Sequence, residues 1–100
     1  MKLDELYQII CDRRDHPVKG SYTASLFAQG EDEMIKKVGE EAIEVVLAAK
    51  GQGDERLVSE VADLAYHVLV LLAYRRLLPA DIENELELRH RKKTAGNTPG

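Results

Sequence analysis

Cysteine and proline are scarce in this chain, and tryptophan is absent. Cys11 is the single cysteine among 100 residues, so no internal disulfide can form, and a reducing compartment, the cytoplasm, is expected. The 3 prolines and 7 glycines leave long stretches without helix breakers. The first ten residues, MKLDELYQII, contain early acids where a secretory signal would carry a basic segment. A secreted protein held together by disulfides is therefore not expected.

Long apolar runs and an excess of positive charge are also missing. The longest apolar run, residues 68–74, is far shorter than the roughly 20 residues that cross a bilayer, so no membrane partner is expected. Lys and Arg number 14 against 18 Asp and Glu, and the net charge is −4. Without an overall basic field, nucleic acid is not an expected partner either.

Helix formers at helical spacing make up most of what is present. Apolar residues recur every three to four positions in segments of about 3–14, 31–50, 54–77 and 79–93, and no segment alternates with the period of two that strands show. Segment 15–30 contains Pro17 and Gly20 and is expected to be a connection in which Leu26 and Phe27 anchor one short helical turn. The sequence predicts one all-α domain over residues 1–93 and a flexible tail over 94–100.

The predicted helix over 54–77 is apolar almost all the way round. A helix of this kind has to be covered on several sides, either at the centre of a bundle or in a subunit interface. A chain of 100 residues is also near the lower limit at which one chain buries a sufficient core alone. We therefore expect a bundle of about four helices that homodimerisation completes.

Two clusters of acidic residues flank the predicted turn near Gln52. One cluster lies in segment 31–50 and the other in segment 54–77, and their members are Glu40, Glu41, Glu44, Glu60 and Asp63. In an antiparallel hairpin that pivots at Gln52, Glu44 lies level with Glu60 and Glu41 lies level with Asp63. At about 1.5 Å rise per residue, these acids lie about 12 to 16 Å from the turn. The spacing predicts that the carboxylates converge on one point.

Converging carboxylates need a positive partner to offset their repulsion. Asp63 needs one most, because we expect its apolar neighbours on the helix to bury it in part. Oxygen ligands without Cys or His suit a hard cation, so Mg²⁺ is expected, with Mn²⁺ as a substitute and Zn²⁺ disfavoured. A structural salt-bridge network with Lys37 is the alternative. A di-iron bundle would require Glu-x-x-His, whereas the spacings here are Glu-x-x-Glu and Glu-x-x-Asp.

A magnesium site built from carboxylates predicts a polyphosphate substrate, because Mg²⁺ is commonly shared between carboxylates and substrate phosphates. Donors for the remaining phosphate oxygens are Lys37, segment 19–23 and the basic end of the last helix, which begins at Arg89. The basic end also suits a helix C-terminus without any ligand. His67 shares a helix stripe with Glu60 and Asp63, where it is either part of the site or a hydrogen-bonded core histidine.

The acidic pattern resembles a known enzyme signature. Glu40-Glu41-x-x-Glu44 with Glu60-x-x-Asp63 is similar to the EExxE…ExxD signature of the MazG-like all-α nucleoside triphosphate pyrophosphohydrolases. Three further segments narrow the resemblance to the phosphoribosyl-ATP pyrophosphohydrolase family of histidine biosynthesis: Ser21-Tyr22-Thr23, KVGEEA over residues 37–42, and EVADLxYH over residues 60–67. Together they extend the resemblance over nearly the whole chain.

The resemblance implies a reaction and assigns roles to residues. It implies hydrolysis of phosphoribosyl-ATP between its α and β phosphates, the second step of histidine biosynthesis, with Mg²⁺ and a homodimeric helical bundle. The implied metal ligands are Glu41, Glu44, Glu60 and Asp63, with Glu40 as a further ligand or base. The expected substrate contacts are Ser21, Tyr22, Thr23, Lys37, His67 and Arg89. Some relatives are fused to the cyclohydrolase of the next step, and we expect this chain to be monofunctional.

Three other functions fit the same residues. A house-cleaning pyrophosphohydrolase would use the same carboxylates on ordinary or damaged deoxynucleoside triphosphates. A non-catalytic helical dimerisation module would use the acids only in salt bridges and would tolerate Asp63→Asn. A regulatory domain would bind the nucleotide without cleaving it.

Overall fold

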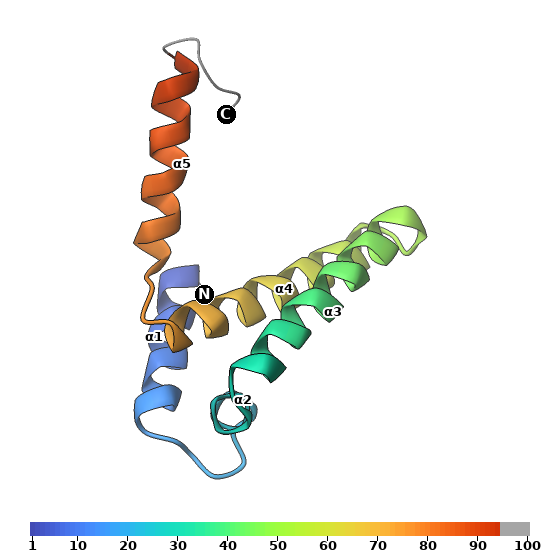
Figure 1. Ribbon diagram of the computed structural model, residues 1–100. Coiled ribbons are helices and arrows are strands. Elements are labelled where there is room, and N and C mark those ends of the chain that lie inside the picture. Colours follow the sequence, from blue (N-terminus) through green and yellow to red (C-terminus); the bar gives the residue numbers. More distant parts are fainter. Residues whose placement is uncertain (95–100) are drawn as a thin grey trace.

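The computed structural model describes residues 1–94 of the chain. This range forms helices without any strand (Figure 1), and they are α1 (Leu3–Asp15), α2 (Tyr22–Gln29), α3 (Glu31–Gly51), α4 (Asp54–Tyr74) and α5 (Pro79–Thr94). The prediction of an all-α fold is confirmed. Thr94 is the last residue of α5, and the rest of the predicted flexible tail lies outside the described residues.

Helix α2 is longer than the single turn predicted for this region. The hydroxyl of Ser21 accepts a hydrogen bond from the backbone N–H of Ala24 at 3.1 Å and so caps the first turn. The side chain of Leu26 is fully buried, which fixes one face of the helix against the core. Helix α2 ends at Gln29, and Gly30, with φ of +100°, lies between the end of α2 and the start of α3. An N-cap and one buried anchor therefore stabilise an eight-residue helix where we predicted a connection with one turn.

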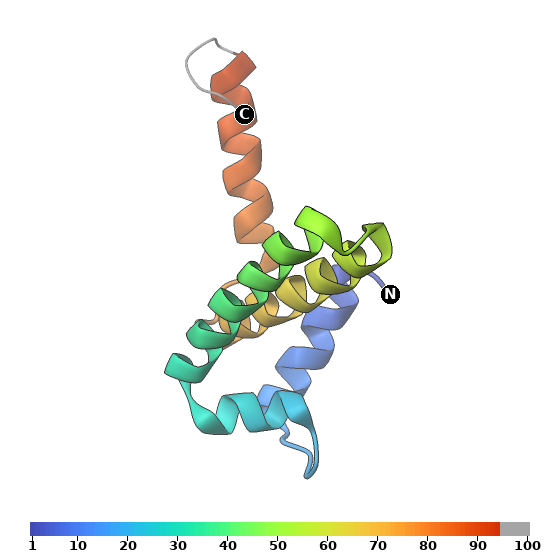
Figure 2. The same cartoon turned by 90° about the vertical axis from the view of Figure 1, so that its right-hand side faces the viewer.

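Helices α3 and α4 form the predicted antiparallel hairpin (Figures 1 and 2). Gln52 follows the last turn of α3, and Gly53, with φ of +88°, precedes α4. A positive φ favours glycine, because it has no Cβ to clash with the backbone. The turn is therefore centred where the two acidic clusters of the sequence require it.

The hydrophobic core lies where α1 and α2 pack on the C-terminal half of α4 and the start of α3. Its buried members are Tyr7, Ile10, Leu26, Met34, Leu69, Val70 and Ala73. Two hydrogen bonds attach α1 to the end of α4 and the link that follows it. The hydroxyl of Tyr7 donates to the carbonyl of Leu77, and Arg14 donates to the carbonyl of Ala73 at 2.7 Å. The buried core residues that α4 contributes all lie in its C-terminal half.

Helix α4 would be long and apolar enough to cross a membrane by length and composition alone. The length of the longest uninterrupted apolar run did not indicate this. Leu69, Val70 and Ala73 of α4 lie in the buried core, and 28% of the apolar window of the helix is buried inside the chain.

This chain leaves part of α4 uncovered. An apolar groove of about 400 Å³ runs along α4, lined by Val61, Leu64 and Val68 together with Leu3 and Ile82. Helix α5 extends away from the other helices in both views (Figures 1 and 2), and its side chains are exposed from residue 80 to residue 93. Residues 1–94 thus leave an apolar part of α4 uncovered.

Candidate metal centre

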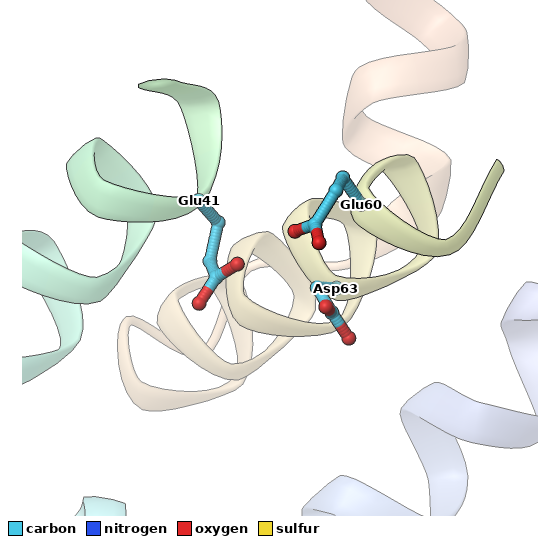
Figure 3. A group of neighbouring side chains, drawn as sticks. All are labelled: Glu41, Glu60 and Asp63. Atoms are coloured by element: carbon cyan, nitrogen blue, oxygen red, sulfur yellow. The ribbon is translucent and has the colours of Figure 1, made fainter. Parts of the chain in front are cut away.

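Three carboxylates meet between the two helices of the hairpin. Glu41 extends from α3, and Glu60 and Asp63 extend from α4 (Figure 3). One oxygen atom from each residue lies within 4.8 Å of those of the other two. Glu60 and Asp63 contribute to the same group because residues three positions apart are neighbours on a helix. We call these three residues the carboxylate triad.

The members of the carboxylate triad differ in burial, and one prediction was wrong. Glu60 is buried, Glu41 is half-buried and Asp63 is exposed. We expected Asp63 to be partly buried because of its apolar neighbours. Val61 and Ala62 beside it are exposed as well. Burial depends on what packs across the helix, and apolar neighbours along the chain do not provide it.

The other two acids of the predicted site lie on α3 near the triad. Glu44 is half-buried and follows Glu41 by one turn, but it is not part of the group of converging oxygens found in residues 1–94. Glu40 is exposed and forms an ion pair with Lys37 at 3.7 Å. The predicted pair of Glu41 and Asp63 therefore meets, whereas Glu60 joins Glu41 in the triad without Glu44. Side-chain direction decides this as much as height along the hairpin.

Arg56 is a residue of the site that sequence reasoning missed. Its guanidinium Nη2 lies 2.8 Å from Oε1 of Glu60. The two residues are four positions apart on α4, and this i, i+4 spacing of opposite charges was the signal that could have found the pair. Lys37, which we considered as the partner of the acids, pairs with Glu40 outside the triad.

The donor set fits a hard divalent cation. All three triad members offer carboxylate oxygens, which Mg²⁺ and Mn²⁺ prefer, and no Cys or His belongs to the group. Three like charges within 4.8 Å also repel one another strongly where one of them is buried. Residues Glu41, Glu60 and Asp63 are thus suited to hold Mg²⁺.

A hydrogen-bonded network joins α2 to α4 beside the triad. The Nδ1–H of His67 donates to the carbonyl oxygen of Asp63 at 2.8 Å. A neutral His67 then accepts a hydrogen bond at Nε2, and the hydroxyl of Tyr22, 3.1 Å away, donates it. The hydroxyls of Thr23 and Tyr66 form a second bond between these helices. Burial raises the pKa of Tyr66 above its usual value, so this hydroxyl stays protonated.

The surroundings of His67 match one of the two roles that the sequence left open for it. The side chain is buried, and both ring nitrogens have partners within the chain. His67 therefore has the character of a hydrogen-bonded core histidine that positions α2 against the helix of Glu60 and Asp63. The ring of Tyr22, by contrast, is half exposed.

The structure does not bring Arg89 to the triad of its own chain. Arg89 lies on α5 and forms an ion pair with Glu85 at 3.4 Å. Helix α5 leads away from α3 and α4 in both views (Figures 1 and 2). Its basic end matches the favourable placement of cations at a helix C-terminus.

Comparison with known proteins identifies the family. Residues 3–90 match the sequence profile of the family described as phosphoribosyl-ATP pyrophosphohydrolase. A phosphoribosyl-ATP pyrophosphatase of Pelotomaculum thermopropionicum is 56% identical over 90 residues, which cover 90% of this chain and 92% of that protein. A phosphoribosyl-ATP pyrophosphatase of Clostridium botulinum is 48% identical over 90% of this chain and 82% of its own length.

A bifunctional relative is similar to this chain over part of its length. The histidine biosynthesis bifunctional protein HisIE of Thermosynechococcus vestitus is 49% identical over 89 residues, which cover 89% of this chain and 42% of that protein. The span that matches the family profile, residues 3–90, includes the carboxylate triad, Arg56 and the network around His67. This chain belongs to the phosphoribosyl-ATP pyrophosphohydrolase family.

Proposed function

We propose that this chain hydrolyses phosphoribosyl-ATP to phosphoribosyl-AMP and pyrophosphate in histidine biosynthesis, with Mg²⁺ as its cofactor. The observation that carries the proposal is the carboxylate triad, formed between α3 and α4 in a chain of this family. Relatives that share about half of its residues are phosphoribosyl-ATP pyrophosphatases by name. The chain is accordingly a hydrolase, and the triad is where we place its chemistry.

The acidic residues divide the work between them in this proposal. Glu41, Glu60 and Asp63 hold the cation, and Glu44, half-buried one turn beyond Glu41, is the proposed fourth ligand. Bound Mg²⁺ supplies positive charge that neutralises phosphate oxygens and activates water for attack, and Mn²⁺ is a chemical substitute. Glu40, which lies outside the triad and forms an ion pair with Lys37, is the proposed acceptor of the proton of the attacking water.

The substrate contacts come from α3 and from the start of α2. Lys37 lies one turn before Glu41 on α3 and is half-buried, so its ammonium suits a phosphate oxygen. Tyr22 and Thr23 extend from the first turn of α2, and the half-exposed ring of Tyr22 suits contact with the nucleotide. Ser21 acts through the helix that it caps, since its hydroxyl already accepts from Ala24. His67 holds Tyr22 in place.

We also propose that two copies of the chain associate through the groove of α4 and through α5. Helix α5 has exposed Ile82, Leu86 and Leu88 and packs little on its own chain. An isolated helix of 16 residues is only marginally stable in water, so α5 needs a partner. The apolar groove along α4 begins beside Ile82, which makes the two surfaces continuous.

A cytoplasmic location is supported by Cys11, a free thiol.

The decisive experiment measures pyrophosphate release from phosphoribosyl-ATP with Mg²⁺ and with EDTA. ATP and dCTP are run beside it. Release from phosphoribosyl-ATP alone, and only with the metal, is the expected result. Release mainly from ATP and dCTP would instead assign the chain to the house-cleaning enzymes. No release from any substrate would leave a binding or dimerisation module.

A further inference from the structure

Glu60 is almost inaccessible to solvent, at 4% exposure, yet it carries a carboxylate. An isolated buried carboxylate is costly, because the charge loses its hydration without receiving compensation. Of the basic side chains in the described part of the chain, Arg56 is the one that forms an ion pair with it, at 2.8 Å. The pair therefore offsets the charge of Glu60 in the folded chain.

Arg56 itself is placed very differently from its partner. The side chain of Arg56 is 56% exposed, whereas that of Glu60 is 6% exposed. Arg56 also lines a polar hollow of about 330 Å³, together with Gln52, Glu55 and Ser59. The guanidinium of Arg56 is thus open to solvent and has polar residues beside it, whereas the carboxylate of Glu60 is enclosed.

The guanidinium and a metal ion require the same carboxylate. Glu60 belongs to the triad, whose oxygens lie within 4.8 Å of one another, and it is also the acceptor for Arg56. Two cations in contact with one carboxylate also repel each other at this short range. Occupation by one therefore weakens occupation by the other.

We propose that Arg56 is the internal counter-cation of the carboxylate triad. It neutralises Glu60 while no metal is bound, and it moves from Glu60 toward the polar hollow when a divalent cation binds. The inference rests on the proposed function, because it takes Glu41, Glu60 and Asp63 as the cation ligands. Arg56 is then a positioning residue that keeps the site intact without metal and limits its affinity for metal.

Removal of Arg56 has two opposite effects under this proposal. The variant Arg56→Gln loses stability in EDTA, since the buried Glu60 loses its partner. Its affinity for a divalent cation rises by about twofold to tenfold, because the cation no longer has to break the i, i+4 ion pair between Arg56 and Glu60. The lower limit of this range corresponds to the strength of an exposed pair at the same spacing. A purely structural salt bridge would lower stability without any gain in metal affinity.

The experiment titrates full-length protein with Mn²⁺ and follows the free ion by electron paramagnetic resonance, with Mg²⁺ as competitor. Thermal unfolding is recorded in EDTA and in Mg²⁺. Arg56→Gln is compared with Arg91→Gln, which breaks the matched i, i+4 pair with Glu87 on α5 and changes the net charge equally. Arg56→Lys keeps the charge and the fold, and it is expected to bind Mn²⁺ with an affinity between those of the wild type and Arg56→Gln. It replaces Arg56→Gln as the test variant if Arg56→Gln does not fold in EDTA.

The outcomes separate this inference from the proposed function. Tighter Mn²⁺ binding by Arg56→Gln, with Arg91→Gln like the wild type, supports it. Equal or weaker binding by Arg56→Gln overturns the inference and leaves the metal site in place. Failure of the wild type to bind either ion overturns the metal site itself, and the role of Arg56 with it.

Discussion

Glu60 and Asp63 lie one turn apart on α4 and contribute to the same group of oxygens, but their surroundings differ. Glu60 is buried and paired with Arg56, whereas Asp63 is exposed. Substitutions at these two positions are therefore expected to have different consequences for stability, although both remove a carboxylate from the triad. Asp63 is the better position for a test of function alone.

Asp63→Asn is expected to lower Mg²⁺-dependent pyrophosphate release at least about a hundredfold, because an amide is a much weaker ligand for the cation. Its free energy of unfolding should stay within about 0.5 kcal/mol of the wild type, since the side chain is exposed. Urea unfolding in EDTA measures the second quantity. Asp32→Asn, an exposed acid in the first turn of α3, is the control and should leave both unchanged. Full activity in Asp63→Asn would contradict the metal role.

Tyr22→Phe removes the hydroxyl that donates to the buried Nε2 of His67. The loss of one hydrogen bond, with the histidine nitrogen left unpaired, is expected to lower the free energy of unfolding by about 1 kcal/mol. Denaturant unfolding checks this, with Tyr74→Phe as a comparably exposed tyrosine of α4. Equal stability of the two variants would mean that water replaces the Tyr22 hydroxyl without cost.

At the scale of elements, backbone geometry and end contacts decide how the helices join. Gly30 separates α2 from α3 without an intervening loop, so the direction of α3 depends on one unusual backbone conformation. Arg14 at the end of α1 bonds to both Asp15 and the carbonyl of Ala73, and so ties α1 to the last turns of α4. Each junction can be tested separately.

Gly30→Ala is expected to destabilise the fold by about 1 to 3 kcal/mol, the cost of a φ/ψ region open essentially to glycine. Gly30 has φ of +100° and ψ of 177°, and no atom lies near enough to clash with an added Cβ. The cost would thus come from the backbone alone. Gly51→Ala, at a helical glycine with equally open space, should be neutral or slightly stabilising. Thermal unfolding of both variants measures the difference.

Acid pH should weaken the contact between Arg14 and Asp15. The hydrogen bond from Arg14 lowers the pKa of Asp15 below its usual value. Asp15 therefore binds a proton more readily in the unfolded chain than in the folded one. The stabilisation from this pair is complete above about pH 4, and it is lost as the pH falls through the lower pKa that Asp15 has in the folded chain. The difference in Tm between wild type and Asp15→Asn should narrow on acidification. Parallel curves down to the lowest pH would contradict the effect.

At the scale of the whole molecule, many apolar side chains lie outside the buried core. The groove of α4 and the apolar side chains of α5 are exposed in a single chain. Both features belong to surfaces that association of two copies would bury, and burial stabilises by about 25 cal/mol per Å² of apolar area. Stability should therefore depend on protein concentration.

Ile82→Lys is expected to shift the chain from dimer to monomer, because a charge placed in the apolar groove loses its hydration on association. Sedimentation velocity over a range of concentrations measures the oligomeric state. Val18→Lys, an exposed apolar residue between α1 and α2, is the matched control and should stay dimeric. A wild type that remains monomeric at all concentrations would exclude the proposed association.

Local pattern was sufficient for most of the helices and for the hairpin. The periodicity of apolar residues, the turn at Gln52 and Gly53, and the spacing of the acids are properties of neighbouring residues, so they predicted α1, α3, α4, α5 and the meeting of Glu41 with Asp63. The conformation of α2 was underestimated, because one cap and one buried leucine outweighed a composition typical of loops.

Tertiary structure alone decided which carboxylate is buried, how much its ion pair with Arg56 contributes and where α5 points. Burial of Glu60 and exposure of Asp63 depend on the helices that pack across α4, and no pattern along α4 encodes them. Arg56 lies four residues from Glu60, but only burial makes their ion pair significant, because exposed pairs contribute little. The residue types of the site are a local property, and their electrostatic environment is set by long-range packing.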